Sequence, residues 1–375
     1  MKNFLLVPDS FKGTISSREI CDILTARIRA HIPQAGVFSI PVADGGEGSV
    51  DCFLTALGGK RVELTVKGPR FEEVRAFYGR LPDGTAVVEM AACAGLPLMK
   101  GRKDPLGATT YGVGQLISDA VENGARHIIL ALGGSATNDM GAGAAAALGV
   151  KFFNREGEPF IPTGGTLHEV VRVDASGLNI GKAYITAMCD IDNPLCGENG
   201  AAYVYGPQKG ADPEMIRLLD AGMAHLAQVV ARDLGKDVLA FPGSGAAGGM
   251  GAGAYAFLGA SLCPGIDTVL DAVNFDALLQ QADCVITGEG RIDAQSLRGK
   301  VVVGVARRCQ KHNVPVIALV GDVGPGAQRA YEQGVTAIFS TNRLAKPLDE
   351  AKKTAKEDLT AAAEDLIRLL ARVAP

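Results

Sequence analysis

An apolar run that ends in two adjacent glycines constrains the fold of this chain more than any other feature. Residues 127–132 predict a buried strand, Gly133 and Gly134 a tight turn, and residues 141–148 a helix of small side chains. Adjacent glycines let the backbone approach a ligand closely, and the free N–H groups of a helix N-terminus favour an anion. Taken alone, the segment is equally compatible with a simple strand-to-helix turn capped by a serine or threonine.

Four other stretches repeat this pattern of glycine beside carboxylates or hydroxyls after a short apolar run. In open α/β sheets, ligands bind outside the carboxyl ends of the strands. Five such strand ends therefore favour one extended active site over five unrelated turns. The four stretches are residues 9–13 (Asp-Ser-Phe-Lys-Gly), 43–48 (Ala-Asp-Gly-Gly-Glu-Gly), 189–197 (Cys-Asp-Ile-Asp-Asn-Pro-Leu-Cys-Gly) and 288–293 (Gly-Glu-Gly-Arg-Ile-Asp).

Both ends of the chain alternate short strands with helices. The strands are unbroken apolar runs, which are typical of strands buried on both faces of a parallel sheet. The predicted strands are residues 4–7, 37–40, 284–286, 316–320 and 337–340. The predicted helices are residues 16–31, capped by Ser16 or Ser17, and residues 48–57, 301–311, 327–333 and 348–373.

The middle of the chain has a different pattern. Polar and apolar residues alternate in 61–66, 74–81 and 86–91, and an Asp83-Gly84 turn separates the last two, which predicts antiparallel or mixed strands. A helix over 110–123 and a strand over 183–187 are expected to follow. The simplest arrangement is a three-layer α/β domain made from residues 1–62 and 276–375, interrupted by a second α/β domain over residues 63–275.

Composition excludes several classes of protein. The 375 residues are long for one core, and 47% apolar with 21% charged residues is typical of a globular protein. A net charge of −4 offers no basic face for nucleic acid. None of the eight cysteines forms a Cys-x-x-Cys pair, so free thiols are expected. We find no run long enough for a membrane span or a signal peptide, and expect a cytoplasmic protein.

Five blocks of the sequence resemble those of the bacterial glycerate kinases, in the group whose members form 2-phosphoglycerate. The blocks follow the order of that family and span nearly the whole chain. They are residues 9–13, 43–48, 133–139 (Gly-Gly-Ser-Ala-Thr-Asn-Asp), 206–211 (Gly-Pro-Gln-Lys-Gly-Ala) and 286–291 (Ile-Thr-Gly-Glu-Gly-Arg).

The resemblance implies both a fold and an activity. The fold is a flavodoxin-like three-layer parallel-sheet domain with an inserted swivelling-type β/β/α domain. The activity is phosphorylation of D-glycerate by ATP with Mg²⁺, giving 2-phosphoglycerate rather than 3-phosphoglycerate, in a cleft between the two domains. The chain has no Walker A sequence, so glycine turns before helices must hold the phosphates. No nucleic-acid or membrane partner is expected, and homo-oligomer formation stays open.

Several residues of these stretches are suited to phosphoryl transfer. Carboxylates hold Mg²⁺ and accept the proton of an attacking hydroxyl. Asp190 and Asp44 have glycine-flanked or apolar surroundings, so we expect one of them to be this base, with Asp190 slightly preferred. Asp190 and Asp192 are the candidate Mg²⁺ ligands, and Lys12 is a candidate catalytic cation. The predicted substrate-binding residues are Ser10, Phe11, Lys12, Gly45, Arg291 and Asp293. The predicted ATP- or phosphate-binding residues are Gly133, Gly134, Ser135, Thr137, Asn138, Lys209 and Glu289.

Two alternatives remain from the sequence. One is a kinase that acts on another small hydroxy acid. The other is an NAD-dependent or non-catalytic α/β protein, because residues 243–248 (Gly-Ser-Gly-Ala-Ala-Gly) formally match the dinucleotide fingerprint. No clear strand–turn–helix unit surrounds this match, so we interpret these glycines as sites of close helix packing or as one wall of the nucleotide cleft.

Overall fold

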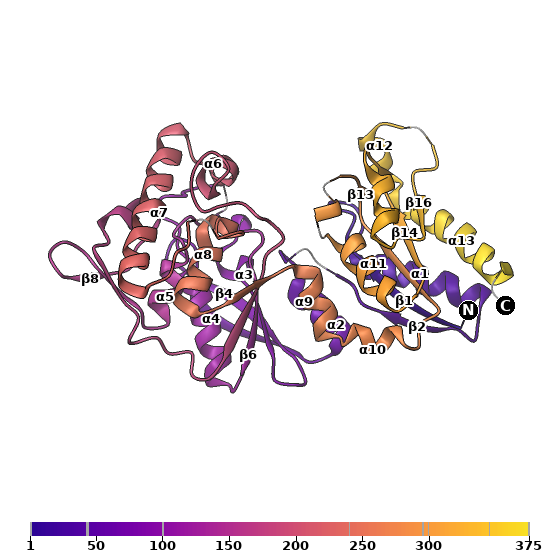
Figure 1. The fold of residues 1–375 in the computed structure, drawn as a ribbon, viewed down its shortest axis with the longest axis horizontal. Coiled ribbons are helices and arrows are strands. Elements are labelled where there is room, and N and C mark those ends of the chain that lie inside the picture. The colour runs from indigo at the N-terminus through magenta and orange to yellow at the C-terminus, as the bar shows by residue number, and fades with distance from the viewer. Residues whose placement is uncertain are drawn as a thin grey trace. The chain divides into compact units, whose positions relative to one another are not determined.

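The chain divides into two compact units (Figure 1). The computed structural model describes residues 2–42, 45–99, 101–239, 241–294, 296–298, 300–344 and 346–373. Unit 1 comprises Met1–Asp44, Thr55–Leu57 and Pro264–Pro375, and unit 2 comprises Gly45–Leu54 and Gly58–Cys263. This division places residues 45–54 and 58–62 in unit 2 and residues 264–275 in unit 1, whereas the sequence predicts junctions at 62/63 and 275/276. Where the functional domains divide stays a prediction.

Unit 1 contains a five-stranded, entirely parallel sheet in the order β16-β14-β12-β1-β2. Counted along the chain within this unit, the order is 2-1-3-4-5, the flavodoxin-like arrangement. All residues of β12 and β14 are buried, as the unbroken apolar runs predict. The α/β fold class expected from the sequence is therefore confirmed. The strands are β1 (Asn3–Pro8), β2 (Gly36–Ser39), β12 (Cys284–Gly288), β14 (Val316–Val320) and β16 (Ala337–Ser340).

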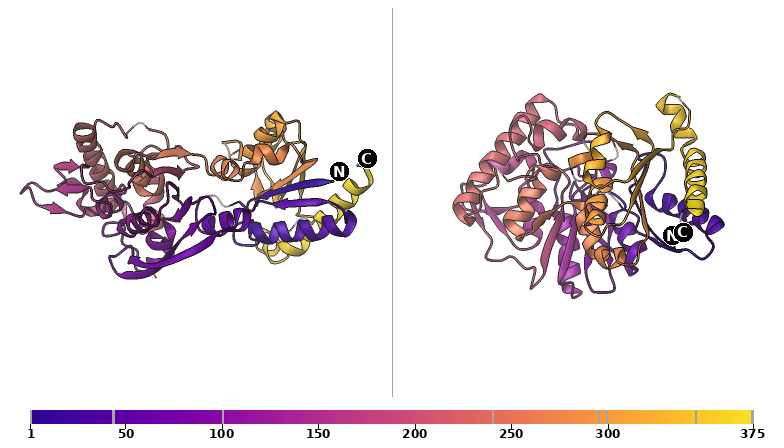
Figure 2. Two further views of the ribbon diagram at one scale, coloured as in Figure 1. Left: turned by 90° about the horizontal axis from the view of Figure 1, so that it is seen from below. Right: turned by 45° about the vertical axis from the view of Figure 1, so that its right-hand side comes forward.

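Helices cover both faces of this sheet. Helices α1 (Ser17–His31) and α13 (Ala355–Val373) lie side by side (Figure 2) and share one core with β1 and β12. Helix α11 (Val301–Lys311) contacts β1, β12 and β14 with residues outside that core. The remaining elements of this unit are α9 (Gly265–Ala272), α10 (Phe275–Leu279), β13 (Arg291–Ile292), η4 (Ser296–Arg298), β15 (Asp322–Val323), η5 (Ala327–Gln333) and α12 (Leu348–Lys353).

The ends of two helices show how side chains set their limits. Ser16 caps α1: its hydroxyl accepts the Glu19 N–H at 3.2 Å, and the Glu19 carboxylate accepts the Ser16 N–H at 3.1 Å. The single helix predicted over 348–373 is wrong, because it is interrupted at Thr354. The Thr354 hydroxyl donates to Asp358 Oδ2 at 2.7 Å, and such local bonds favour a helix start over a helix interior.

Unit 2 is built on a mixed six-stranded sheet in the order β11-β10-β6-β5-β4-β3. Strands β3, β4 and β5 pair antiparallel and β5, β6, β10 and β11 pair parallel, which confirms the predicted mixed strands. A second sheet has the order β8-β7-β9. The strands are β3 (Lys60–Lys67), β4 (Glu73–Arg80), β5 (Ala86–Glu89), β6 (His127–Ala131), β7 (Lys151–Phe153), β8 (Pro159–Phe160), β9 (Arg172–Asp174), β10 (Tyr184–Met188) and β11 (Ser261–Cys263).

Several helices of the middle region share one large apolar core with this sheet. None of the described helices is both long and apolar enough to cross a membrane. All eight cysteines are free thiols, as expected. The helical segments are α2 (Ser49–Leu57), α3 (Ala91–Ala94), η1 (Leu96–Met99), α4 (Tyr111–Glu122), α5 (Ala142–Ala147), η2 (Gly164–Glu169), α6 (Ala201–Tyr205), η3 (Pro207–Lys209), α7 (Pro213–Leu234) and α8 (Ala246–Leu258).

Candidate functional site

Three of the predicted glycine stretches meet in unit 2, where β6 and β10 end side by side. The Gly133 N–H donates to the Gly45 carbonyl at 2.8 Å. A Cβ atom at Gly133 would lie 2.6 Å from the Cα atom of Gly46, so no larger residue fits there. A Cβ atom at Gly45 would lie 3.5 Å from Met188 Cβ, at the end of β10. The predicted clustering of these strand ends is thus observed within this unit.

A buried lysine from a distant segment holds the turn that follows Gly134. Lys209 Nζ donates to the Ser135 hydroxyl at 3.0 Å and to the Thr137 carbonyl at 2.6 Å. The Lys209 side chain is buried, and this burial lowers its pKa to about 7, although the nearby Asp139 carboxylate opposes the shift. Lys209 therefore fixes the shape of the turn. Its predicted contact with ATP or phosphate stays a prediction.

Asp139 anchors the other end of the turn, a role that sequence reasoning missed. Its carboxylate accepts the N–H and hydroxyl of Thr110 at 2.7 and 2.8 Å, and the N–H groups of Gly141 and Gly143 at 3.2 and 3.3 Å. Burial nevertheless raises the pKa of Asp139. The N-cap of α5 is Gly141, with no side-chain capping bond, so the suggested capping of α5 by a serine or threonine is wrong.

Two side chains of the turn are buried without hydrogen-bond partners among the described residues. These are the Thr137 hydroxyl and both polar atoms of the Asn138 amide. Buried polar side chains are rarely left unpaired, so these atoms are candidates to bind a ligand or ordered water. Both residues stay predicted phosphate contacts.

The Gly243–Gly248 segment packs against the same turn. Gly248 has φ +70°, and a Cβ atom there would lie 2.8 Å from Asn138 Cα. None of the described residues among 235–245 belongs to a strand, so the strand that must precede a dinucleotide-binding turn is missing from them. The glycines serve close packing, as the sequence analysis favoured.

The loop after β10 presents two carboxylates to solvent. Asp190 and Asp192 are both exposed, although Asp190 stands among apolar residues in the sequence. The other base candidate, Asp44, lies outside the described residues. Among the described residues, no group of three or more His, Cys, Asp or Glu side chains is arranged to hold a metal ion. The base and Mg²⁺ assignments stay predictions.

A second cluster of predicted residues forms in unit 1, where β1 and β12 end side by side. Pro8 pairs with Gly288, and the Asp9 N–H donates to the Gly288 carbonyl at 2.8 Å. The buried Phe11 donates its N–H to the Ile15 carbonyl at 2.9 Å, which closes the loop. The loop lies against β12, because a Cβ atom at Gly290 would be 3.5 Å from Phe11 Cα.

Two predicted substrate-binding side chains of the loop reach its surface. Lys12 is exposed, and Ser10 is half-buried. The Ser10 N–H donates to Asp9 Oδ1 at 2.7 Å. Lys12 and Ser10 are therefore accessible enough to bind a small anion.

Glu289 is the buried carboxyl group of this cluster. Only 5% of the residue is exposed, and its Oε1 atom has no hydrogen-bond partner among the described residues. Burial raises the pKa of Glu289 to about 7; the Asp9 and Asp293 carboxylates act in the same direction, and the Ser296 hydroxyl and Lys300 oppose it. The sequence placed Glu289 among the phosphate contacts but did not predict its burial.

Arg291 lies beside two carboxylates at the edge of the cluster. Its Nε atom is 3.5 Å from Asp293 Oδ2 and 3.7 Å from Asp322 Oδ2, and 55% of its side chain is exposed. A Cβ atom at Gly324 would lie 2.9 Å from Arg291 Nε, so Gly324 makes room for the guanidinium group. Asp322 is a neighbour that the sequence analysis did not single out.

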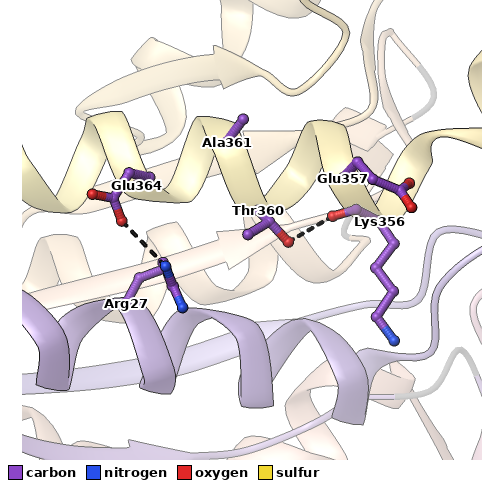
Figure 3. Close-up of a pocket in the computed structure, with 6 residues that line it drawn as sticks. All are labelled: Arg27, Lys356, Glu357, Thr360, Ala361 and Glu364. Carbon is purple, nitrogen blue, oxygen red and sulfur yellow. Dashed lines mark hydrogen bonds and ion pairs between the residues drawn. The ribbon is translucent and has the colours of Figure 1, made fainter.

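A groove of about 520 Å³ between α1 and α13 contains none of the predicted site residues. Figure 3 shows its charged lining, in which Arg27 and Glu364 form an ion pair with an N–O distance of 3.5 Å. Lys356 also pairs with Glu19, at 3.4 Å. Both cations of the groove are therefore paired, and we do not assign the active site to this groove. The groove is lined by Arg27, Lys356, Glu357, Thr360, Ala361 and Glu364.

Comparison with known proteins agrees with the resemblance seen in the sequence. The model of the glycerate kinase family matches residues 4–371. A glycerate kinase of Bacillus cereus is 46% identical over 96% of both chains. A glycerate 2-kinase of Escherichia coli is 42% identical over 98% of this chain and 97% of its own. A crystal structure of a protein named glycerate kinase 2, from Salmonella typhimurium LT2, has a TM-score of 0.87 and 42% identity over 98% of both chains.

Proposed function

The chain belongs to the glycerate kinase family, and from this premise we propose that it transfers the γ-phosphoryl group of ATP to D-glycerate and forms 2-phosphoglycerate. The choice of product is supported by the glycerate 2-kinase of Escherichia coli, which is 42% identical. The observation that carries the proposal is that the predicted site residues gather at strand ends in both units. That the substrates bind in a cleft between two domains stays a prediction.

We assign the phosphate-binding role to the glycine turn of unit 2. Gly133 packs against Gly46 and shapes the turn, and the exposed Gly134 leaves its backbone accessible to phosphate oxygens. The side chains of Thr137 and Asn138, which have no partner among the described residues, are suited to add hydrogen bonds. The hydroxyl of Ser135 is held in place by Lys209. This fixed arrangement suits phosphoryl transfer, in which positioning and charge stabilisation provide most of the catalysis.

Mg²⁺ fits the exposed pair Asp190 and Asp192. This ion is usually held by one or two carboxylates, and water and phosphate oxygens complete its octahedral coordination. When bound, it would neutralise charge on the phosphate oxygens of ATP. The two carboxylates would hold the ion, and their exposure leaves room for its other ligands.

We assign glycerate to the cluster at the ends of β1 and β12. Lys12 and Arg291 are cations suited to the carboxylate of glycerate, since Arg291 can bind it bidentately. Ser10 and the Phe11 backbone lie in the same loop as Lys12. Asp293 lies in the same cluster, beside Arg291. Gly45, in unit 2, stays a predicted substrate contact.

A coupled assay tests both the reaction and its product. The purified protein, with ATP, Mg²⁺ and D-glycerate, should release ADP at a rate that depends on glycerate. ³¹P NMR of the product should show 2-phosphoglycerate. A 3-phosphoglycerate signal would contradict the proposed product, and an ADP-release rate independent of glycerate would contradict the proposed reaction. Higher kcat/KM for another small hydroxy acid would favour the alternative substrate class.

A further inference from the structure

A buried carboxylate oxygen just after β12 has no hydrogen-bond partner among the described residues. Glu289 Oε1 is covered, and no described residue donates a hydrogen bond to it. Leaving a buried polar atom unpaired costs free energy, so such atoms in native proteins call for an explanation. We propose that Glu289 accepts the proton of the glycerate hydroxyl during phosphoryl transfer. This inference rests on the proposed function and assigns the base to a residue other than Asp190 or Asp44.

The position of Glu289 supports this role. Glu289 lies between Gly288 and Gly290. The loop that contains Lys12 packs against this segment, because a Cβ atom at Gly290 would be 3.7 Å from the backbone nitrogen of Lys12. Arg291 follows two residues later in the sequence. Glu289 therefore belongs to the same loop cluster as the residues assigned to glycerate. The Ser296 hydroxyl forms a hydrogen bond with the Glu289 side chain, but no described residue forms one with Oε1.

The charges around Glu289 are suited to a base that works near neutral pH. The pKa of Glu289 is raised to about 7, mainly by burial; the facing carboxylates of Asp9 and Asp293 contribute to this rise, and the Ser296 hydroxyl and the ammonium group of Lys300 oppose it. A general base is most effective when its pKa is close to the working pH. An exposed carboxylate such as Asp190 lacks this burial.

The step balances without any further reactant. The glycerate hydroxyl oxygen forms a bond to the γ-phosphorus of ATP, and the bond from that phosphorus to the β,γ-bridging oxygen breaks, so that ADP leaves. The hydroxyl proton moves to Glu289 Oε1. It returns to solvent when the product has left, and the carboxylate is regenerated.

The pH dependence of kcat tests this assignment. In the wild type, kcat for glycerate should rise with pH around an apparent pKa near 7 and then reach a plateau. Glu289→Gln keeps the size of the side chain but cannot accept the proton, so kcat should fall by about a hundredfold or more and lose this pH dependence. KM for ATP and for glycerate should change only a few-fold. Glu289→Asp, which retains a carboxylate, should keep the rise with pH at a lower rate.

Glu332→Gln is the matched control, because Glu332 is an exposed glutamate of the same unit; its kcat should equal that of the wild type at every pH. If Glu289→Gln keeps kcat within tenfold of the wild type, or if wild-type kcat falls as pH rises through 7, the assignment is overturned. Should Glu289→Gln fail to fold by circular dichroism, a Glu289→Asp variant that is folded and lacks the rise with pH would overturn it too. A wild type that is inactive with glycerate refutes the proposed function itself.

Discussion

Glu289→Gln should make the protein more stable at pH 8 while it makes the enzyme slower. The pKa of this carboxyl is about 7 in the folded chain, against 4.5 for the unperturbed group. The folded state therefore holds this proton up to a higher pH than the unfolded state does. From pH 4.5 to 7, stability falls as pH rises, because the buried carboxylate must be ionised in the fold.

The size of this effect follows from the two pKa values. A difference of about 2.5 units corresponds to roughly 3 kcal/mol of unfolding free energy, lost between pH 4.5 and 7. Glutamine does not titrate, so the variant does not lose this unfolding free energy as the pH rises. For a unit of roughly 160 residues, the gain at pH 8 corresponds to a rise in Tm of roughly 6–12 °C.

Thermal unfolding followed by circular dichroism at pH 4, 6 and 8 measures the difference. The Tm of Glu289→Gln should be close to that of the wild type at pH 4 and above it at pH 8. Glu332→Gln should show no such pH-dependent difference. If the Tm difference between Glu289→Gln and the wild type is the same at pH 4 and pH 8, Glu289 has no raised pKa and the reasoning from its burial is refuted.

Three other substitutions test the roles of single residues. Lys209→Met leaves the buried Thr137 carbonyl and Ser135 hydroxyl without their donor, so denaturant titration should show a loss of roughly 2–4 kcal/mol; a loss below about 1 kcal/mol would contradict this. Lys12→Ala should lower kcat/KM for glycerate roughly a hundredfold with little change in Tm, and near-normal kinetics would remove Lys12 from the site. Gly134→Val places a β-branched residue at φ +78°, and activity should be lost while circular dichroism shows a folded protein; surviving activity would make the turn purely structural.

Local patterns in the sequence were sufficient to predict most elements of the fold. The unbroken apolar runs such as 316–320 became the parallel strands of unit 1, and the alternating runs around Gly84 became antiparallel strands. The limits of helices depended on single side chains. The Ser16 cap was predicted because capping is a local pattern, but the interruption at Thr354 depends on bonds with Asp358 and Lys346 that periodicity does not reveal.

Burial of individual carboxylates could not be predicted in the same way. Asp190 and Glu289 both follow short apolar strands and stand beside glycine or apolar residues, yet Asp190 is exposed and Glu289 is buried. The difference arises from what packs over each strand end, and this is decided by residues far away in the chain. For the same reason the sequence missed Asp139, whose partner Thr110 lies 29 residues earlier.

The pairing of β1 with β12 has a consequence for synthesis of the protein. The partner of Phe4 in this ladder is Cys284, so the apolar N-terminal strand cannot pair with β12 until just over three quarters of the chain has been made. At ordinary translation rates of about 5–20 residues per second, this interval lasts on the order of tens of seconds. Unit 2 lies wholly within that interval and can fold first, whereas β1 must be shielded from aggregation. Release of the chain before residue 284 would leave the β12-facing edge of β1 unpaired and prone to aggregation.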